Sequence, residues 1–281
     1  SDAARAAFRR QFLDDNRQYS CAYFRDDNRG PASDLDRAQR DKLEIIGHKL
    51  RLEPGQKVLD IGCGWGGMAF HIHQVSGAEV LGVTLSEEQL KYARAKAERL
   101  GVADKVRFEL IDYRDVEGPF DRIVSVGMFE HVGRPNYFTY FDEVGRLLTE
   151  DGIALIHFID RAGGKGATDS WTAKYIFPGG YTPALSEVMP HVEHAFLWAA
   201  DIEVWRLHYA WTLEHWLRRC REKRAEIVAL YDERFFRMWE FYLVAAMNAF
   251  RHDDHVVFQL QLARHRDAVP LTRDYLYRDG A

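Results

Sequence analysis

Residues 58–67 read Val58-Leu59-Asp60-Ile61-Gly62-Cys63-Gly64-Trp65-Gly66-Gly67, and this stretch decides the fold. An apolar run of strand length passes directly into a glycine-rich turn, and a helical pattern follows over residues 67–75. Glycines let a ligand approach the backbone closely, and a doubly wound sheet binds its ligand at the carboxyl ends of its strands. The stretch therefore predicts a cofactor loop, although an ordinary strand-to-helix turn can carry the same Gly-x-Gly pattern.

Strands and helices alternate along the chain on both sides of this loop. The patterns predict strands at 57–61, 79–84, 106–111, 121–126 and 152–159, and helices at 35–50, 67–75, 87–100 and 137–148. Such alternation indicates right-handed crossovers between parallel strands. We expect an α/β fold with a doubly wound, mostly parallel sheet and helices on both faces.

The alternation stops after residue 160. A glycine-rich and aromatic stretch covers 161–181, a further strand is expected at 202–207, helices at 209–230 and 235–250, and a closing strand at 256–263. We interpret this part as a helical lid insertion, followed by an antiparallel last strand. One globular domain would then have four segments: 1–34 with a short helix at 5–15, the core 35–160, the lid 161–255, and the closing strand and tail 256–281.

Composition excludes several classes of protein. A formal net charge of −5 and a pI near 6.2 give no overall basic field, which argues against nucleic acid as the main partner. The cysteines Cys21, Cys63 and Cys220 have no metal-ligand or disulfide spacing, so we expect no metal site and a reduced, cytoplasmic setting. No apolar run is long enough for a membrane span or a signal peptide.

The glycine spacing alone leaves the cofactor open, because Gly62, Gly64 and Gly67 also fit the dinucleotide pattern Gly-x-Gly-x-x-Gly. Two other features favour S-adenosylmethionine over a nicotinamide cofactor. Asp60 lies two residues before the first glycine, and Asp112-Tyr113 follows a strand, where a carboxylate can accept from the adenine amino group and a ring can cover the base.

The second strand ends in Thr84-Leu85-Ser86, without the acidic residue that often holds ribose hydroxyls. We therefore assign the ribose contacts to Thr84, Ser86 and Gln89.

Several motifs, in order, carry a resemblance to a known family. They are Tyr19-Ser20-Cys21-Ala22-Tyr23-Phe24, the loop 59–67, Gly82-Val83-Thr84-Leu85-Ser86 with Gln89, Val124-Ser125-Val126-Gly127-Met128-Phe129-Glu130-His131-Val132-Gly133, and Lys174-Tyr175-Ile176-Phe177-Pro178-Gly179-Gly180. From about Phe12 to Ala263 the chain resembles the cyclopropane-fatty-acyl-phospholipid synthases and mycolic acid cyclopropane synthases.

The resemblance implies a class I methyltransferase fold and methylene transfer from S-adenosylmethionine to a cis double bond of an acyl chain. The alkene attacks the sulfonium methyl, a carbocation forms, and loss of a proton closes the ring, with bound bicarbonate as the proton acceptor. The implied cofactor residues are Tyr19, Ser20, Asp60, Gly62, Gly64, Trp65, Gly66, Thr84, Leu85, Ser86, Gln89, Asp112 and Tyr113. The implied bicarbonate site consists of Cys21, Glu130, His157, Ile159 through its backbone, and Tyr209.

A bicarbonate ion suits this chemistry because it supplies negative charge near a cation without being a strong nucleophile. His157 and Tyr209 can donate to it, and Glu130 can accept from its hydroxyl. Glu130 must then be ionised in a lipid-lined pocket, and we expect hydrogen bonds from neighbours such as His157 to offset the desolvation. Without the resemblance, Glu130 would be interpreted as a helix cap, and His157 and Cys21 as core residues.

The implied partner is an unsaturated acyl lipid or phospholipid, which suggests a cytoplasmic enzyme in peripheral contact with a membrane; a homodimer is compatible with it. Basic residues follow Trp211, Leu213 and Trp216 on one expected helix, and form either a solvated face or a head-group patch. They are Arg218, Arg219, Arg221, Lys223 and Arg224. Three alternatives stay open: an enzyme making methyl or methylene branches, a small-amine methyltransferase, and a catalytically silent cofactor-binding or membrane-surface protein.

Overall fold

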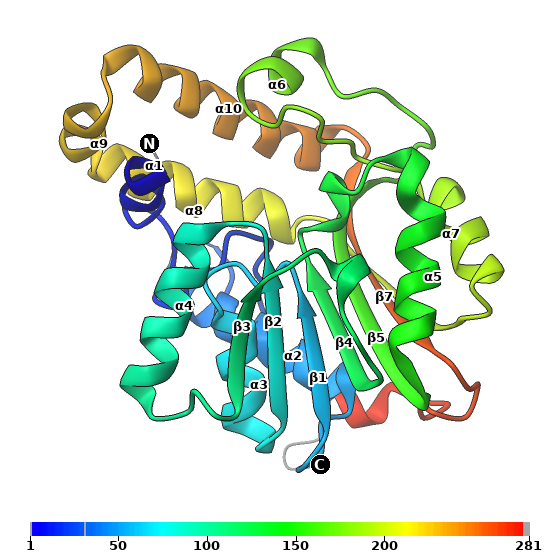
Figure 1. Cartoon of the computed structure of the whole chain (residues 1–281). Coiled ribbons are helices and arrows are strands. Elements are labelled where there is room, and N and C mark those ends of the chain that lie inside the picture. Colours follow the sequence, from blue (N-terminus) through cyan, green and yellow to red (C-terminus); the bar gives the residue numbers. More distant parts are fainter. Residues whose placement is uncertain (1, 31, 278–281) are drawn as a thin grey trace.

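A computed structural model describes residues 2–30 and 32–277 and contains a seven-stranded sheet in the order β3-β2-β1-β4-β5-β7-β6 (Figure 1). The strands are β1 (Lys57–Ile61), β2 (Glu79–Thr84), β3 (Val106–Leu110), β4 (Phe120–Val126), β5 (Leu148–Arg161), β6 (Trp198–Trp205) and β7 (His255–Ala263). β1 to β5 pair in parallel, and β7 runs antiparallel between β5 and β6. The expected mostly parallel sheet with an antiparallel last strand is confirmed. β7 is inserted between β5 and β6, whereas a sheet with the dinucleotide-binding order 3-2-1-4-5-6 has no strand inserted next to its edge.

Helices cover both faces of the sheet, as expected. They are α1 (Asp2–Arg9), α2 (Leu35–Leu50), α3 (Gly67–Ser76), α4 (Glu87–Leu100), α5 (Tyr137–Leu147), α6 (Ser170–Tyr175), α7 (Leu185–His194), α8 (His208–Glu222), α9 (Arg224–Leu230) and α10 (Glu233–His252). Alternate residues of β1 point to opposite faces. Val58 packs in one core with α2, α3 and α4, whereas Leu59 packs in a second core with α5 and α7.

A helical cap lies over the carboxyl ends of the parallel strands (Figure 1). It combines α8, α9 and α10 with the N-terminal α1, and aromatic contacts hold these distant segments together. The ring centroids of Phe8 and Trp239 are 5.0 Å apart, and those of Phe12 and Trp216 are 5.7 Å apart. The first segment of the chain is therefore part of the cap that covers the site.

The structure differs from the sequence-based expectations in several places. The first helix ends at Arg9, because the chain then turns to bring Phe12 onto Trp216. The helix expected over 209–230 is divided at Lys223 into α8 and α9. Neither α6 nor α7 was expected, and the strand expected at 202–207 is β6, which begins at Trp198 and pairs with β7 in the sheet. The four-segment division stays a prediction, and residues 1, 31 and 278–281 lie outside the described residues.

The glycine-rich turn has a structural as well as a functional role. Gly66 is the N-cap of α3 with φ +83°, and a Cβ there would lie 2.8 Å from the Phe108 ring and 2.9 Å from the Phe70 ring. Only glycine fits this close helix-to-strand contact without displacement. Within the described part of the chain, no helix is long and apolar enough to cross a membrane.

Candidate active site

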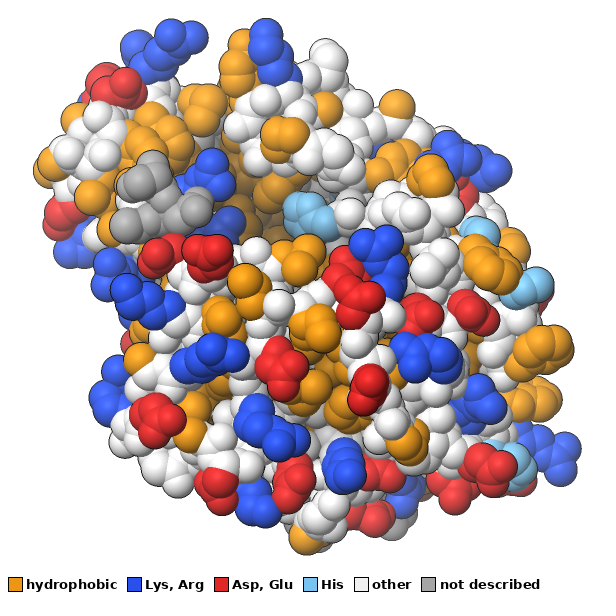
Figure 2. Space-filling view, in the orientation of Figure 1, with side chains coloured by type: hydrophobic (Ala, Val, Ile, Leu, Met, Phe, Trp, Pro, Cys, Tyr) orange, Lys and Arg blue, Asp and Glu red, His pale blue; other side chains and the backbone are white. Residues whose placement is uncertain are grey.

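A cavity of about 760 Å³ opens where the cap meets the carboxyl ends of the strands. Figure 2 shows a hollow with hydrophobic side chains between the upper and lower parts of the molecule. Every predicted cofactor residue except Gly66 lines the cavity: Tyr19, Ser20, Asp60, Gly62, Gly64, Trp65, Thr84, Leu85, Ser86, Gln89, Asp112 and Tyr113. Gly66 packs against the core instead, so its contribution is to the shape of the loop.

Asp60 is a buried carboxylate at the wall of this cavity. It is 2% exposed, and its Oδ2 atom has no hydrogen-bond partner among the described residues. Burial raises the pKa of Asp60 to about 7. An unpaired buried carboxylate fits a ligand that carries an ammonium group, such as the methionine end of the predicted cofactor.

We expect the affinity for S-adenosylhomocysteine to rise with pH through about 7, because Asp60 becomes charged there and can then pair with the ligand's ammonium group. Below that pH the affinity should fall by up to about tenfold per pH unit. Calorimetry at pH 6 and pH 8 measures this. The Asp60→Asn variant should bind more weakly and with little pH dependence; equal affinities of the parent protein at the two pH values would contradict the assignment.

The predicted ribose contacts form a small network at the end of β2. The Thr84 hydroxyl donates to Gln89 Oε1 at 3.1 Å, and the Ser86 hydroxyl accepts from the Gln89 backbone N–H as the N-cap of α4. Ser86 therefore has a capping function in addition to the predicted binding role. All three residues line the cavity.

Asp112 and Tyr113 also line the cavity, but Asp112 is already partnered. Arg114 donates to both of its carboxylate oxygens at 2.8 Å, and this contact lowers the pKa of Asp112. An adenine amino group would have to share this carboxylate with Arg114. The role of Asp112 in adenine recognition stays a prediction.

A second cavity of about 120 Å³ adjoins the first and contains all five residues of the predicted bicarbonate site. These are Cys21, Glu130, His157, Ile159 and Tyr209. The two cavities share the wall residues Tyr19, Ser20, Gly127, His131 and Phe177. The lid segment closes this side of the site, and its Tyr181 backbone N–H donates to the Glu130 carbonyl at 3.0 Å.

Glu130 presents one carboxylate oxygen without a partner. Its Oε1 accepts from the Ile159 backbone N–H at 2.7 Å, while Oε2 is buried and has no partner in the described part of the chain. Burial raises the pKa of Glu130 to about 7, opposed by the bond from Ile159. The sequence interpretation assigns this support to neighbours such as His157; in the structure the Ile159 backbone N–H donates to Glu130.

His157 is fully enclosed at the floor of the second cavity. Its Nδ1 atom lies 3.0 Å from the amide nitrogen of Gln259 on β7, and its ring packs edge-on against Trp205. Burial, followed by the nearby charges of Lys42 and Lys49, holds the pKa of His157 well below its usual value. The imidazole is therefore neutral at physiological pH.

Cys21 and Tyr209 complete the second cavity. Burial raises the pKa of the Cys21 thiol far above its usual value, and Sγ donates to the Ala22 carbonyl at 3.4 Å, so the thiol is not a reactive nucleophile. The Tyr209 ring packs against Phe250 and Trp216, and burial likewise raises the pKa of its hydroxyl, which is therefore a neutral donor.

The sequence interpretation missed polar residues of α2 that lie behind both cavities. Lys42 is fully buried and donates to Ser20 Oγ and Gln18 Oε1, both at 2.8 Å. Gln39 donates to the Ser20 carbonyl at 3.0 Å. The available signal was the spacing of Gln39, Lys42 and Lys49 within the apolar face of one helix, where a polar residue needs a buried partner.

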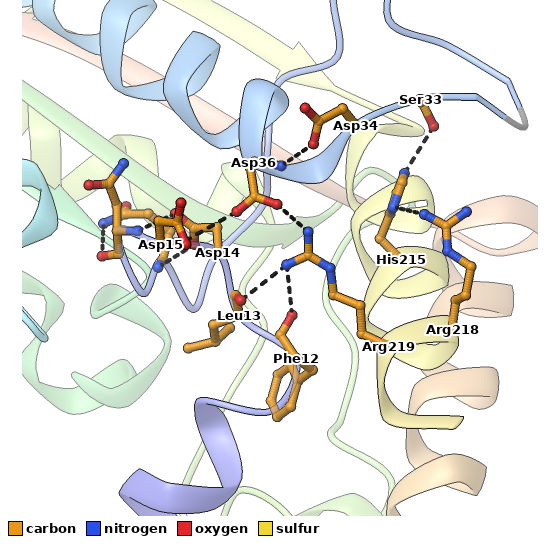
Figure 3. Close-up of polar contacts among 12 residues, drawn as sticks. Phe12, Leu13, Asp14, Asp15, Ser33, Asp34, Asp36, His215, Arg218 and Arg219 are labelled. Carbon is orange, nitrogen blue, oxygen red and sulfur yellow. Dashed lines mark hydrogen bonds and ion pairs between the residues drawn. The ribbon is translucent and has the colours of Figure 1, made fainter. Parts of the chain in front are cut away.

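The five basic residues around α8 are occupied by contacts within the chain. Figure 3 shows the Arg219 guanidinium directed at Asp36 and at the carbonyl oxygens of Phe12 and Leu13, and Arg218 beside His215. Arg221, Lys223 and Arg224 pair with Glu240, Glu226 and Glu233. These contacts favour a structural, solvated role for the five basic residues. They do not favour a patch that binds lipid head groups.

The described residues contain no group of three or more His, Cys, Asp or Glu side chains placed to hold a metal ion. The site has two parts. One is a nucleotide-sized cavity with the buried carboxylate of Asp60 at its wall, and the other is a small cavity beside it that is lined by Glu130 and His157.

The strand order, with an antiparallel strand inserted next to the edge and a cavity over the carboxyl ends, defines a class I S-adenosylmethionine-dependent methyltransferase fold. Residues 2–260 match the family model described as mycolic acid cyclopropane synthetase. The chain belongs to that family.

Individual relatives agree with this assignment. A cyclopropane-fatty-acyl-phospholipid synthase of Escherichia coli is 43% identical over 90% of this chain, and a probable fatty acid methyltransferase of Pseudomonas putida is 39% identical over 97%. The chain spans 64% and 71% of the lengths of these two proteins. The crystal structure of mycolic acid cyclopropane synthase CmaA1 complexed with SAH and CTAB superposes with a TM-score of 0.83 at 29% identity, over 92% of this chain and 94% of that one.

Proposed function

We propose that this protein transfers a methylene group from S-adenosylmethionine to the cis double bond of an unsaturated acyl lipid and so forms a cyclopropane ring. The observation that carries the proposal is the shared wall between the cofactor cavity and the small cavity with the unpaired Glu130 oxygen. A methyl donor in the first cavity and a proton acceptor in the second would meet at one acyl chain. The family membership and the E. coli relative support the same activity.

The residues of the first cavity fit S-adenosylmethionine, which supplies an electrophilic methyl group when bound. Asp60 would pair with its ammonium group, and the Thr84 and Gln89 side chains would contact the ribose. The space in front of Gly64 supports a close backbone contact, because a Cβ at Gly64 would meet no atom within 4 Å. The buried Trp65 and the half-buried Phe177 at the cavity wall would help to exclude water from the reacting atoms.

We further propose that the second cavity holds a bicarbonate ion. Glu130 Oε2 is available to a hydroxyl group, and Tyr209 and His157 can donate to oxygen atoms. The buried ammonium groups of Lys42 and Lys49 add positive potential behind the cavity. An anion held by hydrogen bonds can accept the proton that the substrate loses, while burial keeps the Cys21 and Cys63 thiols at the two cavities protonated, because it raises the pKa of each.

Access for the lipid would lie beside α6 and α10. Trp171 and Phe241 pack together there with ring centroids 4.9 Å apart, and Phe241 and Tyr175 stay 57% and 46% exposed. Lys174 lies over the Tyr175 ring at 5.1 Å. Exposed rings beside a cation suit peripheral contact with a lipid surface.

The variant Phe241→Asp should therefore bind lipid vesicles more weakly than the parent in a flotation assay, because it replaces an exposed ring with a charge. Unchanged binding would contradict this part of the proposal.

Expression in a bacterial host that lacks the enzyme tests the function directly. We expect monounsaturated membrane fatty acids to gain 14 mass units, corresponding to the single added CH₂ group, and fragment patterns to distinguish a ring from a methyl or methylene branch. A branched product would favour the alternative of a fatty-acyl C-methyltransferase, which the P. putida relative's name suggests. Lipids of unchanged mass, with cofactor binding showing that the protein is expressed and folded, would contradict the proposal.

Whether the acyl chain is carried by a phospholipid is decided by the lipid class in which the product appears. A cytoplasmic location, peripheral to the membrane, and a homodimer stay predictions; fractionation of cells and light scattering test them.

A further inference from the structure

A row of buried polar side chains lies directly behind His157. Gln259 on β7 is the cross-strand partner of His157 on β5 on one side and of Glu203 on β6 on the other. Lys49 reaches this row from α2 and bonds to Gln259 Oε1 at 2.7 Å and to Glu203. Lys49, Gln259 and His157 are each at most 2% exposed, so water cannot replace these contacts.

The hydrogen-bond roles along this row follow from chemistry. The Lys49 ammonium group only donates, so Gln259 must direct its carbonyl oxygen at Lys49. The Gln259 amide nitrogen, which also only donates, then lies 3.0 Å from His157 Nδ1. Nδ1 must therefore accept. A neutral imidazole that accepts at Nδ1 carries its proton on Nε2.

The reverse orientation of Gln259 is excluded by its neighbour. It would place the amide NH₂ against the Lys49 ammonium group, and two donors would face each other in a site without water. Lys49 is itself held by Glu203 on the neighbouring strand and cannot move away without leaving that carboxylate unpaired.

We propose that Lys49 and Gln259 are positioning residues that hold His157 as the neutral tautomer protonated at Nε2. His157 is then a hydrogen-bond donor to an oxyanion in the second cavity and has no free lone pair with which to take a proton from the substrate. This inference rests on the proposed function for the identity of the oxyanion, but the tautomer itself can be measured without any turnover.

Nitrogen-15 NMR of the histidine side chains, on the full chain with S-adenosylhomocysteine and no lipid, tests the proposal. The difference spectrum against His157→Gln assigns the signals. We expect His157 to be neutral and protonated at Nε2 between pH 6 and pH 8. A proton on Nδ1, or an imidazolium, in the parent protein would overturn the inference.

Gln259→Glu tests the cause. A carboxylate at 259 can pair with Lys49 but has no proton to donate, so the proton should appear on Nδ1. The matched control is Gln261→Glu, two residues along the same strand, where the side chain bonds the Lys49 carbonyl and Tyr275 and does not touch His157. The control should leave the His157 signals unchanged. Retention of the Nε2 tautomer in Gln259→Glu would show that Gln259 does not set it.

Gln259→Leu tests the consequence for catalysis. It removes the donor to Nδ1, and turnover should fall by about 10- to 100-fold, as for other supporting hydrogen-bond partners, with unchanged affinity for S-adenosylhomocysteine. Full turnover in this variant would overturn the positioning role. If the parent has the expected tautomer but modifies no lipid, the proposed function fails and the tautomer assignment stands; an active parent with another tautomer contradicts only the assignment.

Discussion

Replacement of Glu130 by Gln should lower turnover by about 10²- to 10⁴-fold, the range typical of a lost acid–base group. In the parent, Glu130 Oε2 is buried and without a partner in the described residues, at the wall of the cavity that also contains His157 and Tyr209. In the variant, the amide oxygen can still accept from the Ile159 N–H, so the local structure is preserved. The substitution replaces Oε2, the atom available to a bound anion, with an amide nitrogen. The hydroxyl group of the anion would then face a hydrogen-bond donor in place of an acceptor.

A matched control is provided by Asp160→Asn. Asp160 is a fully buried carboxyl group that lies three residues after His157 on β5 but lines neither cavity. Burial raises the pKa of Asp160 to about 8, so it is already mostly protonated at neutral pH and an amide replaces it at little cost. Turnover of this variant should stay near that of the parent.

The measurement is the rate of lipid modification at saturating cofactor, with binding of S-adenosylhomocysteine as the test of an intact fold. Parent turnover should also fall in buffer freed of bicarbonate and recover when bicarbonate is added. Full activity of Glu130→Gln, or indifference of the parent to bicarbonate, would place the proton acceptor elsewhere.

Gly64→Val should weaken cofactor binding by at least about 100-fold, equivalent to about 2.7 kcal/mol. Gly64 has φ +55°, and a Cβ there would meet no protein atom within 4 Å. The valine side chain would therefore be accommodated by the protein but occupy cavity space that the cofactor needs. Calorimetry with S-adenosylhomocysteine measures the loss.

Backbone strain has to be separated from occupation of the cavity, because a β-branched residue at positive φ is itself unfavourable. Gly101→Val is the matched control. Gly101 has φ +67°, a Cβ there would also meet open space, and the residue lies at the end of α4 away from both cavities. Both variants should lose thermal stability, but only Gly64→Val should lose affinity. Equal affinity losses would attribute the effect to strain.

Much of the fold could be predicted because local patterns and the tertiary structure agree. The alternation around β1 predicted the order of strands and helices up to β5, since buried parallel strands are nearly continuous apolar runs. The prediction was weaker after residue 161, where α7 was missed and one helix was expected in place of α8 and α9. α7 contains Pro190 in its interior, which is atypical of a helix, and no glycine or proline marks the division between α8 and α9 at Lys223.

The candidate site could be predicted in its members but not in its contacts. The motifs identified Glu130, His157 and Asp60, and the structure brings each to a cavity wall. They did not identify the partners: Ile159 for Glu130, Gln259 for His157, and Arg114 for Asp112. A side-chain partner depends on register across strands and on rotamers, neither of which is encoded in a local stretch.

The sequence by itself determined the glycine-rich turn after β1, the mostly parallel sheet and the family, because glycine positions, apolar runs and ordered motifs are local properties of the chain. Only the tertiary structure decided which charges are buried and which are paired. Lys42 and Lys49 of α2 are both buried behind the site, whereas Arg219 and its basic neighbours, which the sequence left open between a solvated face and a head-group patch, pair within the chain. The physical reason is that the energy of a charge depends on its surroundings, and those are set by elements distant in sequence: β6 and β7 for Lys49, and the N-terminal segment for Arg219.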